Sequence, residues 1–149
     1  LKERVNYVNA RLTAQNRGIR VVERKETENG NYMNIIRLNI TTKDKTFTAA
    51  GTIFAKKDAR IVEVNGFEFD VIPSHYMLVA NNIDKPGMIG KIGTLLGINN
   101  INIATMQVSR NVKGQEAMMF LTVDSEISKE TLELVRGVEG ILNMKFVKL

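Results

Sequence analysis

Chemically useful residues concentrate in one short segment, residues 81–90, where an apolar stretch ends in polar residues and a helix is expected to begin. Pro86 suits a first helical turn because its missing N–H would have no partner there, and Gly87 lets a ligand approach the backbone. The first amides of such a helix form an anion site. Asp84, just before it, could accept hydrogen bonds from an ammonium group, and Asn82 can donate or accept. The segment therefore fits a free amino acid, whereas the alternative is a helix-capping loop without a ligand.

Few other residues offer chemistry. The chain has no cysteine and one histidine, His75, so the sequence predicts no thiolate metal site and no histidine-based triad. Glu68 and Asp70 alternate with apolar residues and should face water, unlike a catalytic pair in which one carboxyl lies in an apolar pocket. We therefore expect no catalytic residue, no metal and no cofactor in this chain.

A glycine-rich segment follows the polar one, with glycines at positions 87, 90, 93 and 97. It matches neither the dinucleotide fingerprint nor the phosphate loop. Gly90-Lys91-Ile92-Gly93 does match the short G-x-x-G of RNA-binding KH domains, although there the motif joins two helices and here the apolar spacing runs through it. Each glycine costs a helix interior about 1 kcal/mol relative to alanine. The cluster therefore suggests close approach by a sheet, a partner or a ligand.

Composition narrows the class of protein and its partners. The 149 residues are 44% hydrophobic and 25% charged, which is typical of a globular protein. No stretch approaches the roughly 20 apolar residues of a membrane span, and no secretory segment opens the chain. We expect a cytoplasmic protein with no membrane partner. The net charge of +5 comes mainly from the first half of the chain and includes no run of five or more like charges, so nucleic acid is not an expected partner.

The first half of the chain reads as one helix followed by an antiparallel sheet. Residues 3–17 carry apolar residues on one helical stripe, and Gly18 is placed to cap the end. Alternation in residues 32–41 predicts a half-buried strand, and Asn65-Gly66 predicts a tight hairpin turn. The other expected features are a β-like run at 19–24, a turn at Asn29-Gly30, and strands at 46–54, 60–64 and 67–72.

The second half follows a different order, and we place the domain boundary at Pro73-Ser74, between domains 1–73 and 74–149. Ser128 should cap a helix, with Ile127 and Leu132 as a hydrophobic staple. The expected order is strand 75–82, helix 87–98, strands 101–109 and 116–123, a helix from Ser128, and strand 141–147. This βαββαβ order predicts an α+β, ferredoxin-like domain with both helices on one sheet face. The other face needs a cover, such as a partner.

Several motifs carry a family resemblance. The turn Asp84-Lys85-Pro86-Gly87 and the strand start Asn100-Ile101-Asn102-Ile103 resemble an ACT domain over residues 74–149. The longer stretch from Asn65-Gly66-Phe67 to Gly97, with Val5-Asn6-Tyr7-Val8-Asn9-Ala10 and Arg17-Gly18-Ile19, resembles the C-terminal end of long-form D-3-phosphoglycerate dehydrogenase. Residues 1–73 then resemble that family's intervening, or allosteric substrate-binding, domain, incomplete at its N-terminus.

The resemblance implies a regulatory module that binds an amino-acid effector, L-serine, in an NAD-dependent enzyme of serine biosynthesis. The NAD-binding and catalytic domains would lie upstream, so this chain alone would have no dehydrogenase activity and no cofactor. The implied effector contacts are Asn82, Asp84, Lys85, Pro86, Gly87, Met88, Ile89 and Asn102. The backbone of residues 86–89 would hold the carboxylate, and Asn102 would come from a neighbouring chain in a homodimer or higher oligomer.

This sequence departs from some family members at two effector positions. They have histidine or tyrosine where Asn82 stands and asparagine where Asp84 stands. The resemblance also implies a phosphate contact at Arg60, although two further basic positions of such a site correspond to Ile72 and Thr122 here. Two alternatives remain at this stage: the regulatory part of an iron–sulfur L-serine dehydratase, and a small RNA-binding module that uses the segment Gly90–Gly93.

Overall fold

A computed structural model of the chain describes residues 5–25, 32–55 and 57–149. It divides into two compact units, residues 1–31 and residues 32–149, which are considered separately. The boundary expected at Pro73-Ser74 lies inside the second unit and stays a prediction, while the expected turn at Asn29-Gly30 falls outside the described residues.

The first unit contains helix α1, Ala10–Asn16, which is shorter than the helix expected over 3–17. The side chain of Asn6 accepts from the amides of Val8 and Asn9 (2.9 and 3.1 Å), and Asn9 Oδ1 accepts from the Asn6 amide (2.7 Å). This reciprocal capping satisfies backbone donors locally and marks the start of the helical turn. Gly18 has φ +67° and ends the helix, as predicted.

The β-like run at residues 19–24 is not a strand, so that prediction was wrong. Apolar side chains in this run, Ile19, Val21 and Val22, are all more than half exposed. A strand needs a neighbouring strand to receive its backbone hydrogen bonds, and the described residues of this unit offer none.

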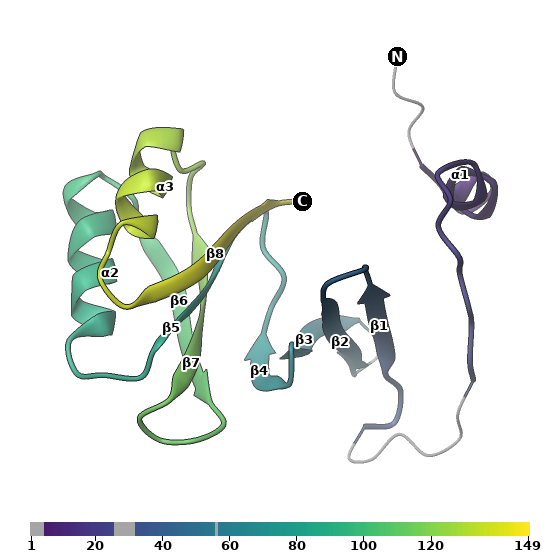
Figure 1. The fold of residues 1–149 in the computed structure, drawn as a ribbon, viewed down its shortest axis with the longest axis horizontal. Coiled ribbons are helices and arrows are strands. Elements are labelled where there is room, and N and C mark those ends of the chain that lie inside the picture. The colour runs from purple at the N-terminus through teal and green to yellow at the C-terminus, as the bar shows by residue number, and fades with distance from the viewer. Residues whose placement is uncertain (1–4, 26–31, 56) are drawn as a thin grey trace. The chain divides into compact units, whose positions relative to one another are not determined.

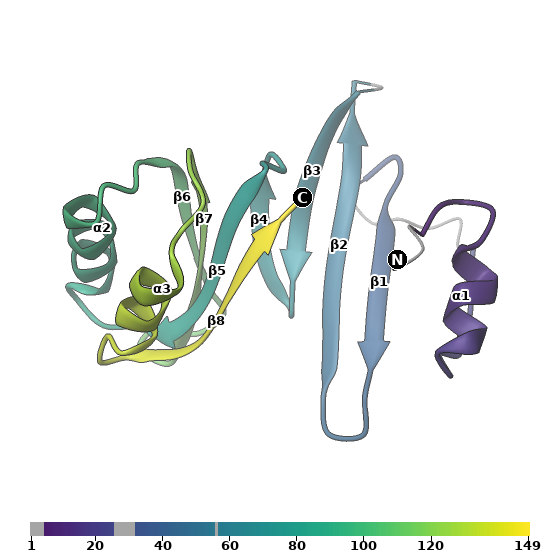
Figure 2. The same ribbon diagram turned by 90° about the horizontal axis from the view of Figure 1, so that it is seen from above.

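The second unit begins with an antiparallel sheet whose strands lie in chain order (Figure 2). Its strands are β1 (Ile36–Thr41), β2 (Thr46–Phe54), β3 (Asp58–Val64) and β4 (Phe67–Val71). The expected tight turn joins β3 to β4, because Asn65 (φ 49°) and Gly66 (φ 81°) both adopt the positive φ that this turn requires.

Strand β1 is exposed along its whole length, which corrects the expectation of a half-buried strand. Its apolar face carries Ile36, Leu38 and Ile40, and Ile36 is 78% exposed. This face lines an open groove of about 1000 Å³ that also includes Met77 and Phe120 of the second sheet. Alternation identified the correct face, but no described residue of this unit covers it.

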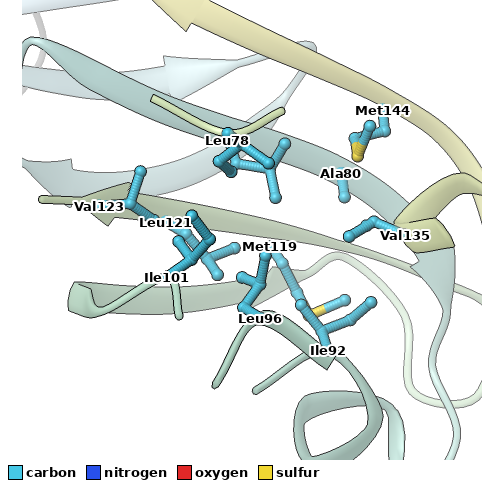
Figure 3. Close-up of a cluster of buried hydrophobic side chains, with 11 residues drawn as sticks. Leu78, Ala80, Ile92, Leu96, Ile101, Met119, Leu121, Val123, Val135 and Met144 are labelled. Carbon is cyan, nitrogen blue, oxygen red and sulfur yellow. The ribbon is translucent and has the colours of Figure 1, made fainter. Parts of the chain in front are cut away.

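The second sheet has the predicted ferredoxin-like arrangement, with strand order β6-β7-β5-β8 and both helices on one face (Figure 1). Its elements are β5 (Tyr76–Ile83), α2 (Met88–Ile98), β6 (Ile103–Arg110), β7 (Glu116–Val123), α3 (Lys129–Arg136) and β8 (Ile141–Lys148). Figure 3 shows Leu78 and Ala80 of β5 and Met119 and Leu121 of β7 in one buried cluster with Ile92, Leu96 and Val135 of the helices.

Strand β4 covers part of the sheet's other face, so that cover comes from the same chain. Phe67, Phe69 and Val71 pack against Met77, Met118 and Phe120. The rings of Phe69 and Phe120 lie 5.6 Å apart in an edge-to-face arrangement. Gln107 of β6 binds the backbone of Asp70 through both ends of its amide, at 2.9 and 2.5 Å. These contacts fix β4 on the sheet.

Helix α3 begins as the sequence predicts. The Ser128 hydroxyl accepts from the Thr131 amide at 3.1 Å, Ile127 is buried, and Leu132 packs against the same core. This is an N-cap joined to a hydrophobic staple. Among the described residues, none of the helices has the length and apolar character needed to cross a membrane.

Candidate functional site

The N-terminus of α2 is open to a ligand. Strand β5 ends at Ile83 and α2 begins at Met88, with Gly87 at the N-cap position in a left-handed conformation (φ 88°). No described side chain caps this helix, and its first turn has no acidic residue. A side chain built at Gly87 would meet nothing within 4 Å, so this backbone borders open space. Helix geometry leaves the first amides without intrahelical partners, and these amides attract a carboxylate.

Asn82 lies at the junction between the end of β5 and the start of α2, called the corner from here on, and one of its acceptor atoms has no hydrogen-bond partner among the described residues. It alternates with Leu78 and Ala80, which pack against α2, and therefore faces the helical side of the sheet. Asn82 is only 2% exposed. Its Nδ2 donates to the carbonyl of Ile83 (2.8 Å), and its buried Oδ1 has no partner among the described residues. An unpaired buried acceptor costs about 1–3 kcal/mol, which a ligand donor would offset.

Asp84 joins the corner to the turn between β6 and β7. Its Oδ2 accepts from the amide of Gly114 (2.9 Å) and from Nη1 of Arg110 (3.2 Å). Its own amide donates to the carbonyl of Gln115 (2.9 Å). The hydrogen bond from the Gly114 amide, followed by the hydrogen bond and charge of Arg110 and the charge of Lys113, holds the pKa of Asp84 below its usual value. The carboxylate is therefore negatively charged at neutral pH and can attract an ammonium group.

Replacing Arg110 by glutamine should raise the pKa of Asp84 toward its ordinary value, because the variant lacks the paired guanidinium. The Gly114 amide and the charge of Lys113 remain, so the pKa should stay below that ordinary value. Because the pKa of Asp84 is lowered in the folded state, the ionised carboxylate stabilises the fold at any pH above the ordinary pKa of Asp. This stabilisation is lost as the pH falls through the pKa that Asp84 has in the folded state. The Arg110→Gln variant should therefore lose less stability on acidification. NMR titration of the Asp84 carboxyl measures the shift. Arg136→Gln, which removes the partner of Glu133, is the control, and an identical Asp84 titration in Arg110→Gln would refute the assignment.

Other predicted contacts lie at the same corner but have different surroundings. The side chain of Lys85 binds Glu139 (2.9 Å), and Met88 is buried against Gly140. Both side chains therefore face the turn between α3 and β8. Ile89 is 55% exposed. In this arrangement Lys85, Met88 and Ile89, with Pro86 and Gly87, can offer a ligand their backbone, whereas Asn82 and Asp84 offer side chains.

Asn102 is not at this corner within one chain. Asn102 precedes β6, and the first residue of β6 pairs with Val123 near one end of β7. Asn82 pairs with Ala117 near the other end of β7. Six residues of strand separate these two positions, roughly 20 Å. Nδ2 of Asn102 instead donates to Oδ2 of Asp124 at 2.5 Å. The predicted set of effector residues is therefore brought together only in part.

Arg60, the implied phosphate contact, is paired within the chain. Its Nε lies 3.1 Å from Oδ1 of Asp70, and Nη1 donates to the carbonyl of Ala59. Of the two other positions, Ile72 is exposed and Thr122 is buried, with its hydroxyl bonded to that of Thr105. A phosphate at Arg60 would have to compete with Asp70, and its binding stays a prediction.

The motif Gly90–Gly93 lies inside the continuous helix α2. Ile92 within it is 1% exposed and belongs to the core. Because the RNA-binding G-x-x-G is a loop between two helices, this geometry removes the basis of the RNA-binding alternative. Side chains built at Gly90 and Gly93 would meet nothing within 4 Å, so the close approach expected at these glycines is not made by any described residue. The apolar spacing that runs through the motif reflects the core position of Ile92.

Sequence reasoning missed the residues that hold the predicted ones in place: Arg110, Gly114 and Gln115 around Asp84, and Asp124 beside Asn102. Gly114 carried a signal, because the glycine marks the turn between β6 and β7 and has φ 79°. The partners themselves depend on strand register, which the sequence does not display.

Comparisons with known proteins match two segments of the chain to known domain families. Residues 1–65 match the family of the D-3-phosphoglycerate dehydrogenase intervening domain, and residues 76–140 match the ACT domain family. D-3-phosphoglycerate dehydrogenases of Synechocystis and Bacillus subtilis are 41% and 38% identical to 100% and 97% of this chain. That of Methanocaldococcus jannaschii is 36% identical over 97%. The chain spans only 27%, 28% and 27% of these relatives' lengths, respectively.

The fold and the matched segments define an ACT domain joined to an intervening domain. The chain is similar to D-3-phosphoglycerate dehydrogenases over the part of those proteins that carries these two domains. The relatives named above are dehydrogenases, so they give no support to the iron–sulfur dehydratase alternative.

Proposed function

We propose that this chain is the effector-binding regulatory part of a cytoplasmic, NAD-dependent D-3-phosphoglycerate dehydrogenase, and that it binds L-serine at the corner between β5 and α2. The observation that carries the proposal is the buried Oδ1 of Asn82, which has no hydrogen-bond partner among the described residues, next to the N-terminus of α2, which no described side chain caps. The carboxylate of an amino acid would accept from the first α2 amides. Its ammonium group would donate to Asp84 and to Oδ1 of Asn82.

A second copy of the chain would complete the site with Asn102. Strand β6 is at the edge of its sheet, so its outer backbone groups are available to another strand. Antiparallel pairing of two β6 strands about a two-fold axis would place the Asn102 end of one beside the Arg110 end of the other. At that end Arg110 forms an ion pair with Asp84, so the Asn102 of one chain would lie near the Asp84 of the other. This symmetry supports a homodimer in which each effector lies between two ACT domains.

The regulatory effect would be a shift in a conformational equilibrium of the whole enzyme. The catalytic steps and NAD would belong to domains outside this chain, which alone would have no dehydrogenase activity. Coupling between an effector site and a distant active site is typically about 1–3 kcal/mol, or several-fold to roughly 100-fold in affinity. Serine bound at the interface would exert this effect by favouring one arrangement of the paired ACT domains.

Calorimetry on the dimeric chain with L-serine, D-serine, glycine and L-alanine tests the proposal directly. We expect saturable binding of L-serine at one site per chain and weaker binding of the other three. D-serine inverts the α-carbon, while glycine and alanine lack the side-chain hydroxyl. Analytical ultracentrifugation establishes that the chain is dimeric under the same conditions. Failure of every amino acid to bind the dimer would overturn the proposal and leave an ACT domain with a purely structural role.

A further inference from the structure

We propose that Gln107 couples the corner to the first sheet, because it fixes the position of β4 along β6. The inference rests on the proposed function and deepens it: it names the side chain that carries a change at the effector site to the other sheet. Gln107 is a positioning residue in this proposal and does not contact the effector. The connection lies within one chain and runs through five residues, Asp84, Arg110, Gln107, Asp70 and Arg60.

The side-chain amide of Gln107 takes the place of a neighbouring strand at the edge of β4. Among the described strands β4 is the last of the first sheet, so its outer backbone groups have no strand partner there. Gln107 Oε1 accepts from the amide of Asp70 (2.9 Å), and Nε2 donates to the carbonyl of Asp70 (2.5 Å). One side chain thus meets both backbone groups of one residue, as the opposite residue of an antiparallel ladder does. We call this pair of hydrogen bonds the clamp.

The clamp is directional, whereas the apolar contacts beside it are not. Phe69 packs against Phe120, and Phe120 pairs with Gln107 across β7 and β6. Hydrophobic burial depends on the area that is covered and has no preferred direction. Two hydrogen bonds to one residue instead require Asp70 to lie directly beside Gln107. The clamp therefore sets where β4 lies along β6, while the apolar contacts hold β4 against the sheet.

Strand β6 also reaches the corner. Arg110 is the last residue of β6, three residues after Gln107, and its Nη1 lies 3.2 Å from Oδ2 of Asp84. An ammonium group bound at Asp84 would share that carboxylate with Arg110 and weaken the ion pair. Among the described strands β6 is bonded to β7 alone, so fewer backbone hydrogen bonds resist its movement than in a central strand. A ligand at the corner can therefore displace the strand that carries the clamp.

Asp70 carries the connection into the first sheet. Its backbone is held by Gln107, and its Oδ1 lies 3.1 Å from Nε of Arg60 on the neighbouring strand β3. The register of β3 and β4 is irregular between Ile61 and Glu63, so the ladder beside this ion pair is already interrupted. A displacement of Asp70 by the clamp would change the ion pair. The Nε–H of Arg60 is therefore a reporter, on the first sheet, of events at the corner.

NMR of the whole chain tests the coupling with L-serine as the probe. In the parent chain, L-serine should shift the Arg60 Nε–H signal with the same midpoint as calorimetric binding. Gln107→Met keeps a side chain of similar length without the amide. In this variant the shift should fall by roughly five-fold or more, while L-serine affinity stays within several-fold of the parent. The control Gln15→Met removes an exposed glutamine amide from α1 and should retain the parent shift.

A cycle of variants tests the same coupling without a ligand. Asp84→Ala releases Arg110 and should shift the Arg60 signal, whereas the same change introduced into Gln107→Met should not. Gln107→Met by itself should speed hydrogen exchange of the Asp70 amide by roughly 10-fold, because that amide loses its acceptor. Thermal unfolding confirms that each variant is folded at the temperature of the NMR measurement.

The outcomes separate this inference from the proposed function. L-serine binding without a change at Arg60, or with an equal change in the parent and in Gln107→Met, would overturn the coupling and leave the effector site intact. Absence of L-serine binding would overturn the proposed function, and the cycle with Asp84→Ala would then decide the coupling alone. Unchanged exchange of the Asp70 amide in Gln107→Met would show that Gln107 does not hold β4.

Discussion

Replacing Asp84 by alanine is expected to weaken L-serine binding by roughly one to two orders of magnitude. The carboxylate provides the negative charge for the ligand's ammonium group, and hydrogen bonds to charged groups are stronger than those between neutral ones. The lowered pKa of Asp84 means that this charge is present throughout the neutral range. Calorimetric titration of the folded variant with L-serine measures the loss.

The control for this variant is Asp44→Ala, which removes an exposed carboxylate from the turn before β2. It should leave L-serine affinity unchanged, because Asp44 lies in the turn between β1 and β2 of the first sheet, whereas the proposed site lies on the second sheet. Alanine at 84 also frees Arg110 and the amide of Gly114, so the turn between β6 and β7 should exchange its amides faster. L-serine binding that remains tight in both Asp84→Ala and Asn102→Ala would exclude the proposed site.

The second large effect concerns stability: Leu96→Ala should lower the free energy of unfolding by about 2–5 kcal/mol. Leu96 is completely buried in the cluster that joins α2 to the sheet. Its truncation removes apolar contacts and leaves a cavity that the surrounding strands can only partly fill. Urea unfolding followed by circular dichroism gives the loss from the shift of the midpoint.

Ile98→Ala is the matched control, because Ile98 lies on the same helix and is 75% exposed. Its truncation should change the free energy of unfolding by no more than about 0.5 kcal/mol. L-serine should raise the unfolding midpoint of both variants, since a ligand that binds the folded state stabilises it. Equal losses in the two variants would contradict the packing of α2 against the sheet.

The sequence by itself determined the features that depend on neighbouring residues. Asn65-Gly66 specified a tight turn because both residues adopt positive φ without much strain, and Ser128 specified a helix start because its hydroxyl reaches an amide three residues ahead. Apolar periodicity then gave the order of strands and helices in the second half. The corner of Asn82, Asp84 and Gly87 could be predicted as a site for the same reason, since these residues lie close together in the sequence.

Only the tertiary structure decided which distant groups hold those residues. Asp124 meets Asn102 because β6 pairs with β7, and Arg110 meets Asp84 because the register of β5, β7 and β6 brings their ends together. Burial depended on the same level of structure: no described residue of the second unit covers the apolar face of β1, whereas β4 covers part of one face of the second sheet. Periodicity reports which face of an element is apolar, but strand register and packing between elements far apart in sequence determine what that face or side chain contacts.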